Sequence, residues 1–440
     1  MKEVTKTDEQ IIREKITEKL VQKDVPVKFP IFEMTKENTD GLYKTDEAER
    51  KDLREIDCFT IDGPTAKELD DALSLNLTEY GYRLGVHIAD VAAYVFVESD
   101  LSKEAENRGI TIYFPGYSIP MFPGYISEQV CSLNPDSDKK AVTMFIDFSP
   151  DGKIIGYEVC RSLIRSRVRG IYSEVNAILE HTADDAVFSK YEPVVDEIMN
   201  MRRLAELLRN RRANSGAGVR SEGEFKYSFV DGKLELISQG NTAADMIVCE
   251  FMVAANTCMS FYFEDNKLPG LYRVQKETTT SAGYSTVPHN HESLALCGGY
   301  MRFTSPIRRA ADFQVHQVLT AFLSGAAPED LRDEYLEKMT AYCGQAQYLE
   351  ERARELERSI LRECHFLYFA KHTEDCFRGV VIGANNYSGD AVISLQPYNI
   401  RILGASCLSK YVGQEFQIKV MVDNERGHLR VGHISRIAAA

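Results

Sequence analysis

Paired cysteines are missing from this sequence of 440 residues. Ten cysteines are present, but no two of them stand at the C-x-x-C spacing that zinc sites and thiol redox sites use. We therefore expect neither a zinc site nor a disulfide framework. Scattered, unpaired thiols are typical of a reducing compartment, so we expect a cytoplasmic protein.

Long apolar runs are also missing. No uninterrupted apolar run approaches about 18 residues, and the N-terminal stretch Met-Lys-Glu-Val-Thr-Lys is polar. We therefore expect no membrane span and no signal peptide. The stretch from Asn241 to Phe263 is long and largely apolar, which predicts a helix buried in the protein.

Positive charge is scarce, because 52 Lys and Arg stand against 66 Asp and Glu and leave a net charge of -14. On its face this charge argues against a nucleic-acid partner. Overall charge is a poor guide, however, where a substrate enters a channel whose lining alone must be basic. An arginine-rich helix face is also typical of a merely solvated surface. Arginine is concentrated locally at Arg202, Arg203, Arg209, Arg211, Arg212, Arg308 and Arg309.

The length predicts two or three domains, and the composition, 44% hydrophobic and 27% charged, is that of a soluble protein with a large core. Residues 1–50 form a short charged segment with one predicted helix, from Glu9 to Val21. Residues 51–375 are predicted to form the main domain, and residues 376–440 a second, smaller domain.

The main domain changes character along the chain, which predicts an α+β fold. Its first half contains the predicted strands Tyr82–Ile88, Val142–Phe148 and Ile154–Ser162. After Tyr172 the apolar residues recur at helical spacing. Helices are predicted at Val195–Leu208, Asn241–Phe263, Ile307–Leu323 and, as one or two helices, Asp330–His372.

The C-terminal segment contains five short alternating stretches in about 60 residues, which suit an OB-type barrel. Its basic residues outnumber its acidic ones, against the trend of the whole chain. A purely structural barrel is the alternative to one that binds RNA. The expected strands are Phe377–Ile382, Asp390–Leu395, Ile400–Leu403, Glu415–Val422 and Leu429–Ile434, and the basic residues are Arg378, Arg401, Lys410, Lys419, Arg426, Arg430 and Arg436.

Residues Thr60 to Ala72 read T-I-D-G-P-T-A-K-E-L-D-D-A and gather four acids in ten residues. A strand end followed by the Gly63-Pro64 turn lets the later acids fold back toward the first. Carboxylates this close repel one another unless cations lie between them, and Mg²⁺ prefers such oxygen ligands. A solvated acidic loop is the alternative. The four acids are Asp62, Glu68, Asp70 and Asp71.

This run resembles the signature of the ribonuclease II / ribonuclease R family, the RNB exoribonucleases. Further blocks match in the expected order, and together they span roughly residues 55–370. They are Val86–Val91, Tyr113–Gly116 with Ile119–Met121, Cys131–Leu133, Met252–Asn256, Leu271–Val274 and, most specific of all, the F-T-S-P-I-R-R run of Phe303–Arg309.

The resemblance implies an RNB catalytic domain followed by an OB-fold RNA-binding domain. It implies a monomeric enzyme that hydrolyses single-stranded RNA from 3′ to 5′ and releases nucleoside 5′-monophosphates. Its two-metal chemistry would use Mg²⁺, with Mn²⁺ as a possible substitute. By position, the metal ligands would be Asp62, Glu68, Asp70 and Asp71, and Asp70 would also be catalytic.

The resemblance also assigns residues that hold the RNA. Arg308 would bind the reacting phosphate from a helix start fixed by Pro306, and Glu357 would organise the active site. Tyr113 would stack on a base near the 3′ end. The alternative for Arg308 is a surface ion pair, that for Glu357 is a solvated helix face, and that for Tyr113 is a place in the core. Further RNA contacts would come from Tyr172, Glu250 and Arg309, the last of which is equally consistent with a structural role.

Three residues that depart from the family pattern keep a second reading open. Glu68 stands where the family has aspartate, Cys249 precedes Glu250 where two glutamates are usual, and Gln275 replaces a histidine. The N-terminal segment is also too short for tandem cold-shock barrels. The alternative is a catalytically weak RNB-like protein that binds RNA without turnover. A metal-dependent phosphatase acting on small esters is a third reading, but it would need neither the barrel nor the stacking tyrosine.

Overall fold

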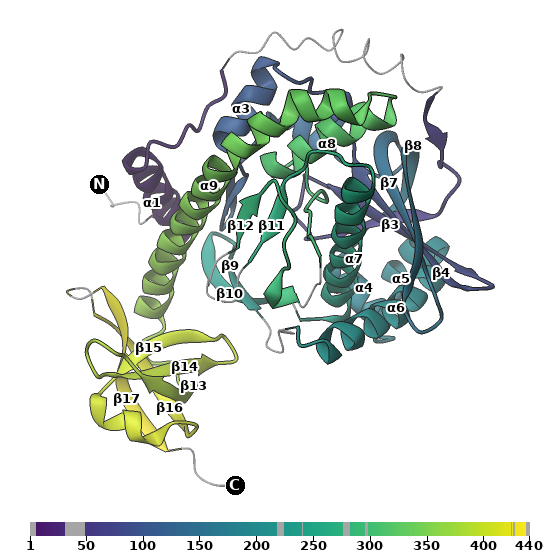
Figure 1. Cartoon of the computed structure of the whole chain (residues 1–440). Coiled ribbons are helices and arrows are strands. Elements are labelled where there is room, and N and C mark those ends of the chain that lie inside the picture. The colour runs from purple at the N-terminus through teal and green to yellow at the C-terminus, as the bar shows by residue number, and fades with distance from the viewer. Residues whose placement is uncertain are drawn as a thin grey trace.

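The computed structural model describes residues 6–30, 49–217, 224–239, 241–275, 282–294, 298–423, 425 and 427–436. Much of the N-terminal segment and the barrel residue Arg426 therefore lie outside the described residues. Figure 1 shows a mixed α/β body, one long helix along its side, and a yellow barrel at the foot of that helix. The expected α+β class is confirmed.

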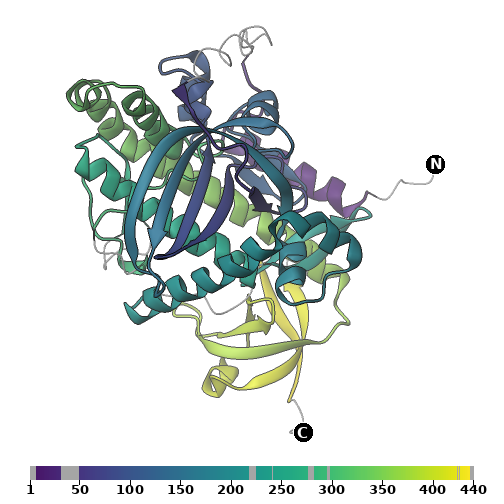
Figure 2. The ribbon, with the colours of Figure 1, turned by 90° about the vertical axis from the view of Figure 1, so that its right-hand side faces the viewer.

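A six-stranded sheet forms the centre of the body, in the order β1-β8-β2-β3-β4-β7. The long strand β8 pairs with β7 through its first part and with β2 through its last part, so it bends across the sheet. Figure 2 shows this sheet on its face, with the green helices behind it. The strands are β1 (Lys51–Asp52), β2 (Cys58–Asp62), β3 (Asp71–Thr78), β4 (Gly81–Ala89), β7 (Asp138–Phe148) and β8 (Ile154–Ile171).

Strand β4 shows how deeply the sheet is buried. Leu84, Val86 and Ile88 point to one face and are fully buried, as expected for a core strand. His87 on the opposite face is also fully buried, between Ser74 Oγ at 2.9 Å and Thr143 Oγ1 at 2.8 Å. The sheet is therefore covered on both faces in this region.

Helices cover the sheet, and α7 (Ala243–Asp265) is the most buried long one. Within the described residues, α7 alone is long and apolar enough to cross a membrane, but 67% of its most apolar window is buried in the protein. It is therefore a core helix, as the sequence predicted. The other helices between the N-terminal helix and the long one are α3 (Asp100–Arg108), α4 (Tyr172–Leu179), α5 (Asp185–Tyr191), α6 (Val195–Asn214) and α8 (Ala310–Leu323).

Helix α9 (Pro328–Lys371) is a single helix of 44 residues and about 66 Å, at about 1.5 Å per residue. Its first half packs through Leu331 and Met339 on the main core. Its second half packs through Leu356 and Ile360 in a second core that it shares with the barrel. The helix therefore connects the two hydrophobic cores of the protein.

The N-terminal helix α1 (Asp8–Gln22) belongs to this second core. Ile12, Ile16 and Leu20 are buried in it. Figure 1 shows α1 beside α9. The carboxylate of Asp8 accepts the backbone N–H of Leu234 at 3.0 Å and pairs with Lys371. The short N-terminal segment thus joins α9 to the hairpin of β9 (Glu224–Val230) and β10 (Lys233–Gln239).

The C-terminal strands close into a five-stranded barrel in the order β13-β14-β15-β17-β16, as predicted for an OB-type fold. Among its basic residues, Arg378 pairs with Glu415, Lys419 with Glu374, and Arg430 with Asp390. Arg401 and Lys410 are exposed and have no acidic partner among the described residues. The strands are β13 (Phe377–Ala384), β14 (Ala391–Gln396), β15 (Ile400–Gly404), β16 (Glu415–Asp423) and β17 (His428–Arg436).

Smaller elements were not predicted. They include the hairpin of β5 (Ile112–Phe114) with β6 (Tyr117–Ile119) and that of β11 (Tyr272–Val274) with β12 (Gly283–Ser285). Both lie close to α9, and both carry residues of the sites described below. Strands this short have little sequence pattern, because tertiary contacts rather than alternation hold them in place. Short helical turns occur at Val91–Ala93, Tyr125–Val130, Glu192–Val194, Glu292–Leu294 and Ser406–Tyr411.

Candidate active site

Two neighbouring strands bring the acidic run to one edge of the sheet. Asp62 ends β2 and Asp71 begins β3, and these strands are antiparallel partners, so both acids lie at the same edge. Arg169 holds the loop between them, because its Nη2 donates to the carbonyls of Pro64 at 3.2 Å and Ala66 at 2.6 Å. The solvated-loop alternative is therefore wrong for this stretch.

Asp70 joins the acidic run to the F-T-S-P-I-R-R run. Its Oδ1 accepts the backbone N–H of Ile307 at 2.8 Å, and its Oδ2 accepts Nε of Arg308 at 3.1 Å. Asp70 is only 2% exposed, whereas the Arg308 side chain is 36% exposed. Arg308 Nη2 donates to Ser305 Oγ at 2.9 Å, which fixes the direction of the guanidinium while leaving part of it open to a ligand.

Arg308 does not stand at a helix start, contrary to the prediction. Residues 305–309 form a turn, in which the N–H groups of Arg308 and Arg309 both donate to the Ser305 carbonyl, and α8 begins only at Ala310. A helix begun at Pro306 would use the Ala310 N–H, but that group donates to the Gly109 carbonyl at 2.8 Å, and the Arg308 carbonyl accepts the Thr111 N–H at 3.0 Å. Long-range contacts therefore override the local signal from Pro306.

Burial favours the protonated, neutral form of the acids. Burial first, and carboxylate neighbours second, raise the pKa of Asp62, Asp70 and Asp71 to about 7. The Arg308 guanidinium opposes the rise in all three but does not cancel it. A divalent cation would favour the ionised forms, since an opposite charge nearby lowers a carboxyl pKa.

The donor set fits a hard cation only if water or substrate completes it. Among the described residues, no three His, Cys, Asp or Glu side chains are arranged as a ready metal-binding group. Mg²⁺ often uses one or two protein carboxylates together with waters and phosphate oxygens. Asp62 and Asp71 are the freest for this role, because Asp70 already accepts hydrogen bonds on both oxygens.

Glu68 lies beside the other acids but is bonded to a tyrosine. Its Oε2 accepts the hydroxyl of Tyr113 at 2.9 Å, with Thr111 Oγ1 at 3.5 Å. Burial raises the pKa of Glu68, while the hydrogen bond from Tyr113 lowers it. The longer side chain thus reaches Tyr113, and its role as a metal ligand stays a prediction.

Tyr113 is exposed, so the alternative of a core tyrosine is wrong. The residue lies on β5 and is 46% exposed. Its backbone N–H donates to Glu357 Oε1 at 3.2 Å, so α9 fixes the position of this strand. Glu357 therefore lies at the site, where it contacts Tyr113. The alternative, that it belongs to a solvated helix face, is wrong.

Tyr172 stands on the other side of the acids. It begins α4 directly after Ile171, which is the partner of Asp62 in the parallel pairing of β8 and β2. Burial raises the pKa of its phenol, and the charges of Asp71 and Asp62 raise it further. Tyr172 therefore lies near the acids, and its contact with RNA stays a prediction.

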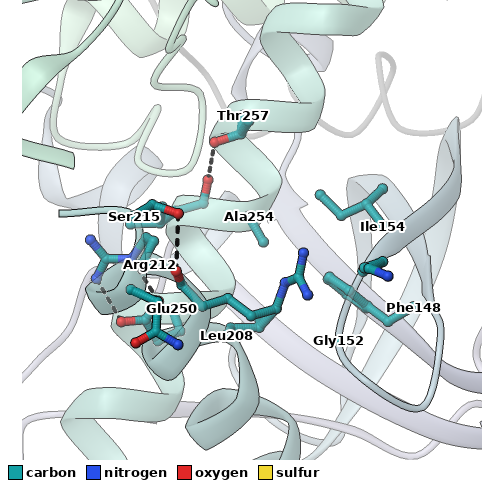
Figure 3. A pocket seen from close by; sticks show the side chains of 13 residues that line it. Phe148, Gly152, Ile154, Leu208, Arg212, Ser215, Glu250, Ala254 and Thr257 are labelled. Carbon is teal, nitrogen blue, oxygen red and sulfur yellow. Dashed lines mark hydrogen bonds and ion pairs between the residues drawn. The ribbon is translucent and has the colours of Figure 1, made fainter. Parts of the chain in front are cut away.

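Glu250 and Arg309 are held by partners within the protein. Both oxygens of Glu250 accept hydrogen bonds from Arg212, at 2.9 and 2.6 Å, and Glu250 is 3% exposed. Figure 3 shows this pair at one side of a pocket of about 660 Å³ between α6, α7 and the β7–β8 turn. Arg309 donates to Asp312 Oδ2 from Nε at 3.0 Å and from Nη2 at 2.7 Å. Their roles in RNA binding stay predictions.

Sequence reasoning missed three residues that hold the site together. Arg169 ties the acidic loop, Ser305 directs Arg308, and Asp312 accepts both Arg309 and the N–H of Ser305. Asp312 had a usable signal, since a pair three residues apart on a helix start is a common ion pair. Arg169 had none, because its partners are backbone carbonyls about a hundred residues away.

Comparison with known proteins places this site in a family. The chain is 29% identical over 449 residues to ribonuclease R of Chlamydia trachomatis, covering 89% of this chain and 62% of the relative. Mycoplasma genitalium RNase R in complex with ribose-methylated single-stranded RNA has the same fold, with a TM-score of 0.80 at 22% identity over 96% of this chain and 78% of that one.

Yeast Ssd1, a pseudonuclease, also has this fold, with a TM-score of 0.64 at 15% identity over 88% of this chain and 53% of that one. The sequence pattern of the RNB domain matches residues 50–281 and 276–325. That match includes the four acids, Tyr113, Tyr172 and the F-T-S-P-I-R-R run, which the fold assembles at one sheet edge. The chain therefore belongs to the RNB domain family.

Proposed function

We propose that the protein is a metal-dependent 3′→5′ exoribonuclease that hydrolyses single-stranded RNA to nucleoside 5′-monophosphates. The observation that carries this proposal is the bond between Asp70 and Arg308, which joins a buried acidic cluster to a half-open guanidinium. An exposed tyrosine stands beside them. The chain spans about 62% of the length of the Chlamydia trachomatis ribonuclease R. The activity is therefore proposed for this chain from its own site and is not carried over from that relative.

The proposed chemistry divides between the acids and the arginine. Asp62 and Asp71, with Asp70 and Glu68 beside them, would hold Mg²⁺ or Mn²⁺, which supplies water activation and neutralises charge on the leaving oxygen. Arg308 contributes free donors to a phosphate from a direction that Ser305 fixes. Its fixed orientation favours the charge that develops in the transition state.

Tyr113 is suited to hold the last bases of the strand. Its half-exposed ring offers a stacking surface that does not depend on base identity, worth about 1–3 kcal/mol per base. Glu357 and Glu68 fix the strand and the hydroxyl of this residue, so the ring is directed from two points. We propose that the enzyme acts as a cytoplasmic monomer on single-stranded RNA.

The test uses RNA labelled at its 5′ end, incubated with Mg²⁺ and resolved by length. Shortening from the 3′ end, with a nucleoside 5′-monophosphate as the released product, is the expected result. Asp70→Asn is the matched control, since it keeps the side-chain volume and removes one charge. Cleavage that begins inside the strand, or a released 3′-phosphate, would contradict the proposal.

A catalytically weak RNA-binding protein is the second candidate. The bond between Glu68 and Tyr113 favours it, because it engages a carboxylate that the metal reaction would use. The fold likeness to a pseudonuclease is compatible with it. Tight RNA binding without shortening, in Mg²⁺ and in Mn²⁺, would favour this candidate over the first.

A further inference from the structure

Three arginines gather around one glutamate at a second place in the fold. Arg273 comes from β11, Arg302 from the segment before α8, and Arg354 from α9, one turn after Glu350. Tyr284 of β12 completes the group. We call these five residues the arginine cluster. No motif identified in the sequence contains it as a whole.

Glu350 is the common acceptor of the arginine cluster. Its Oε2 pairs with Arg273 Nη2 at 3.0 Å and with Arg354 Nη2 at 2.7 Å, and its Oε1 accepts Arg302 Nη2 and the Tyr284 hydroxyl. The guanidinium carbons of Arg273 and Arg302 also lie 4.6 and 5.5 Å from the centre of the Tyr284 ring. The fork-shaped side chains are therefore held in defined orientations.

The charges of the arginine cluster do not balance. Three guanidinium groups face one carboxylate, and the side chains of Glu350 and Arg273 are only 8% and 7% exposed. Burial would raise the pKa of Glu350, but Arg302 and Arg273 outweigh it and lower that pKa to about 2. Burial and the charge of Arg302 lower the pKa of Arg273. The charge of Asp312 offsets part of the excess at Arg302. The buried positive charge that remains is costly unless an anion accompanies it.

Two donors of the arginine cluster have no acceptor among the described residues. They are Nη1 of Arg273 and Nε of Arg302, and both are buried. The cluster is not sealed, because the side chains of Arg354 and Arg302 are 38% and 19% exposed. An anion with several oxygens can approach the exposed parts of Arg354 and Arg302 from this open side, as phosphate does with arginine forks. The two unpaired N–H groups are buried and lie outside its direct reach.

The arginine cluster lies next to the catalytic turn but is distinct from the acids. Arg302 precedes Arg308 by six residues, and the charge of Asp312, which pairs with Arg309, also acts on Arg302. Asp70 pairs with Arg308 alone among these arginines. A strand whose reacting phosphate lies at Arg308 would therefore place a different phosphate at the cluster.

We propose that the arginine cluster binds one internucleotide phosphate of the RNA strand, at a linkage other than the one being cleaved. This inference rests on the proposed function for the identity of the strand. The cluster would hold the strand in register while the acids and Arg308 act on its end. Its contribution is to affinity at one linkage, and the chemistry of cleavage belongs to the acids.

The test measures binding of a 5′-fluorescein oligouridylate of about 12 nucleotides to the full chain carrying Asp70→Asn, which prevents degradation. Each linkage in turn is made neutral as a methylphosphonate. Arg354→Gln removes a charge at a partly exposed position, and Arg302→Lys keeps the charge but loses the planar fork. Arg332→Gln, exposed near the start of the same helix, is the matched control.

We expect one linkage whose neutralisation weakens binding by about tenfold in the parent and by about twofold in Arg354→Gln and in Arg302→Lys. Penalties at the other linkages stay as in the parent, and Arg332→Gln changes none of them selectively. The slope of log affinity against log salt falls by about 0.7 in Arg354→Gln, the value for one contact on a single strand.

Other outcomes would overturn the proposal. An unchanged profile in both variants would assign the arginine cluster to packing alone, and a uniform loss at every linkage would reduce it to general electrostatics. A third outcome is that uridine 5′-monophosphate competes for binding, that both variants abolish this competition, and that the linkage profile does not change. The arginine cluster would then be a site for the released nucleotide. If the linkage effect appears but the chain with Asp70 intact never shortens RNA, the exonuclease proposal fails while this one stands.

Discussion

The acidic site and the arginine cluster are two buried groups whose charges are unbalanced in opposite directions. At the acidic site, burial raises the pKa of three aspartates to about 7, and one half-exposed arginine faces them. In the arginine cluster, Arg302 and Arg273 outweigh burial and lower the pKa of Glu350 to about 2. An imbalance that costs folding energy is informative, because it indicates which charge must arrive from outside: a cation in one place, a phosphate in the other.

Asp70→Asn should produce the largest effect and would separate rate from affinity. We expect cleavage to fall by about a hundredfold or more, since metal chemistry contributes several kcal/mol. RNA affinity should stay nearly intact, because the remote phosphate contacts survive. Single-turnover rates and binding curves on the same RNA check this. A variant that retains more than about a tenth of the parent rate would contradict the role of Asp70.

Arg401→Gln with Lys410→Gln tests whether positive charge on the barrel acts as it does in the arginine cluster. Deleting the barrel would expose the core it shares with α1 and α9, so substitution is the cleaner experiment. We expect affinity for long RNA to fall about tenfold and the salt slope to fall by about 1.4. Arg378→Gln, at a residue already paired with Glu415, is the control. Equal salt slopes in all three proteins would exclude the barrel surface.

Tyr113→Ala should change the length of the shortest product, with a smaller effect on the rate for long RNA. Stacking matters most when few other contacts remain. Tyr113→Phe keeps the ring and removes only the bond to Glu68, so its limit product should match the parent. Products are resolved by length at completion. The stacking role fails if Ala and Phe give the same limit product.

Glu68→Asp tests the departure at the metal site. We expect it to lower the Mg²⁺ concentration for half-maximal rate by about threefold, because octahedral Mg²⁺ tolerates little misplacement of a ligand. Mn²⁺ should support the parent well. Metal titrations of both proteins give the answer. A higher requirement in Glu68→Asp would show that glutamate, held by Tyr113, is the fitted ligand.

The smallest expected effect is on the pH dependence of stability without metal. The aspartates have folded pKa values near 7, above their unfolded values, so the folded state binds more protons between pH 4 and 7 and loses stability as pH rises. Glu350 has the opposite shift, so its contribution is present at neutral pH and is lost only as pH falls through about 2.

Thermal unfolding in EDTA at pH 5.5 and pH 8 distinguishes the two groups. Asp71→Asn should shrink the difference between these midpoints by about 2 °C. Glu350→Gln should lower both midpoints together, because its carboxylate is ionised at both values. A pH difference unaffected by Asp71→Asn would mean that the acids titrate normally in the metal-free protein.

The features that could be predicted from the sequence are those that depend on residues close together along the chain. The acidic run, Tyr113 and the arginine pair were recognisable because each motif is short and contiguous, and the barrel strands followed from alternation between turn residues. The predicted helix start at Ile307 failed because the Ala310 N–H and the Arg308 carbonyl bond to Gly109 and Thr111, which lie about two hundred residues away in the sequence. The arginine cluster was invisible for the same reason, since four separate segments supply its members.

Because α9 is a single uninterrupted helix, the directions in which its side chains point are fixed relative to one another. Glu350, Arg354 and Glu357 lie four and three residues apart, so a single helical phase aligns the arginine cluster with the strand that carries Tyr113. One inserted residue between Glu350 and Glu357 would rotate the second contact by about 100° and shift it by about 1.5 Å. Seven inserted residues, close to two turns, would nearly restore the direction of the second contact but move it by about 10 Å along the axis, so the spacing between Glu350 and Glu357 is fixed in both angle and length.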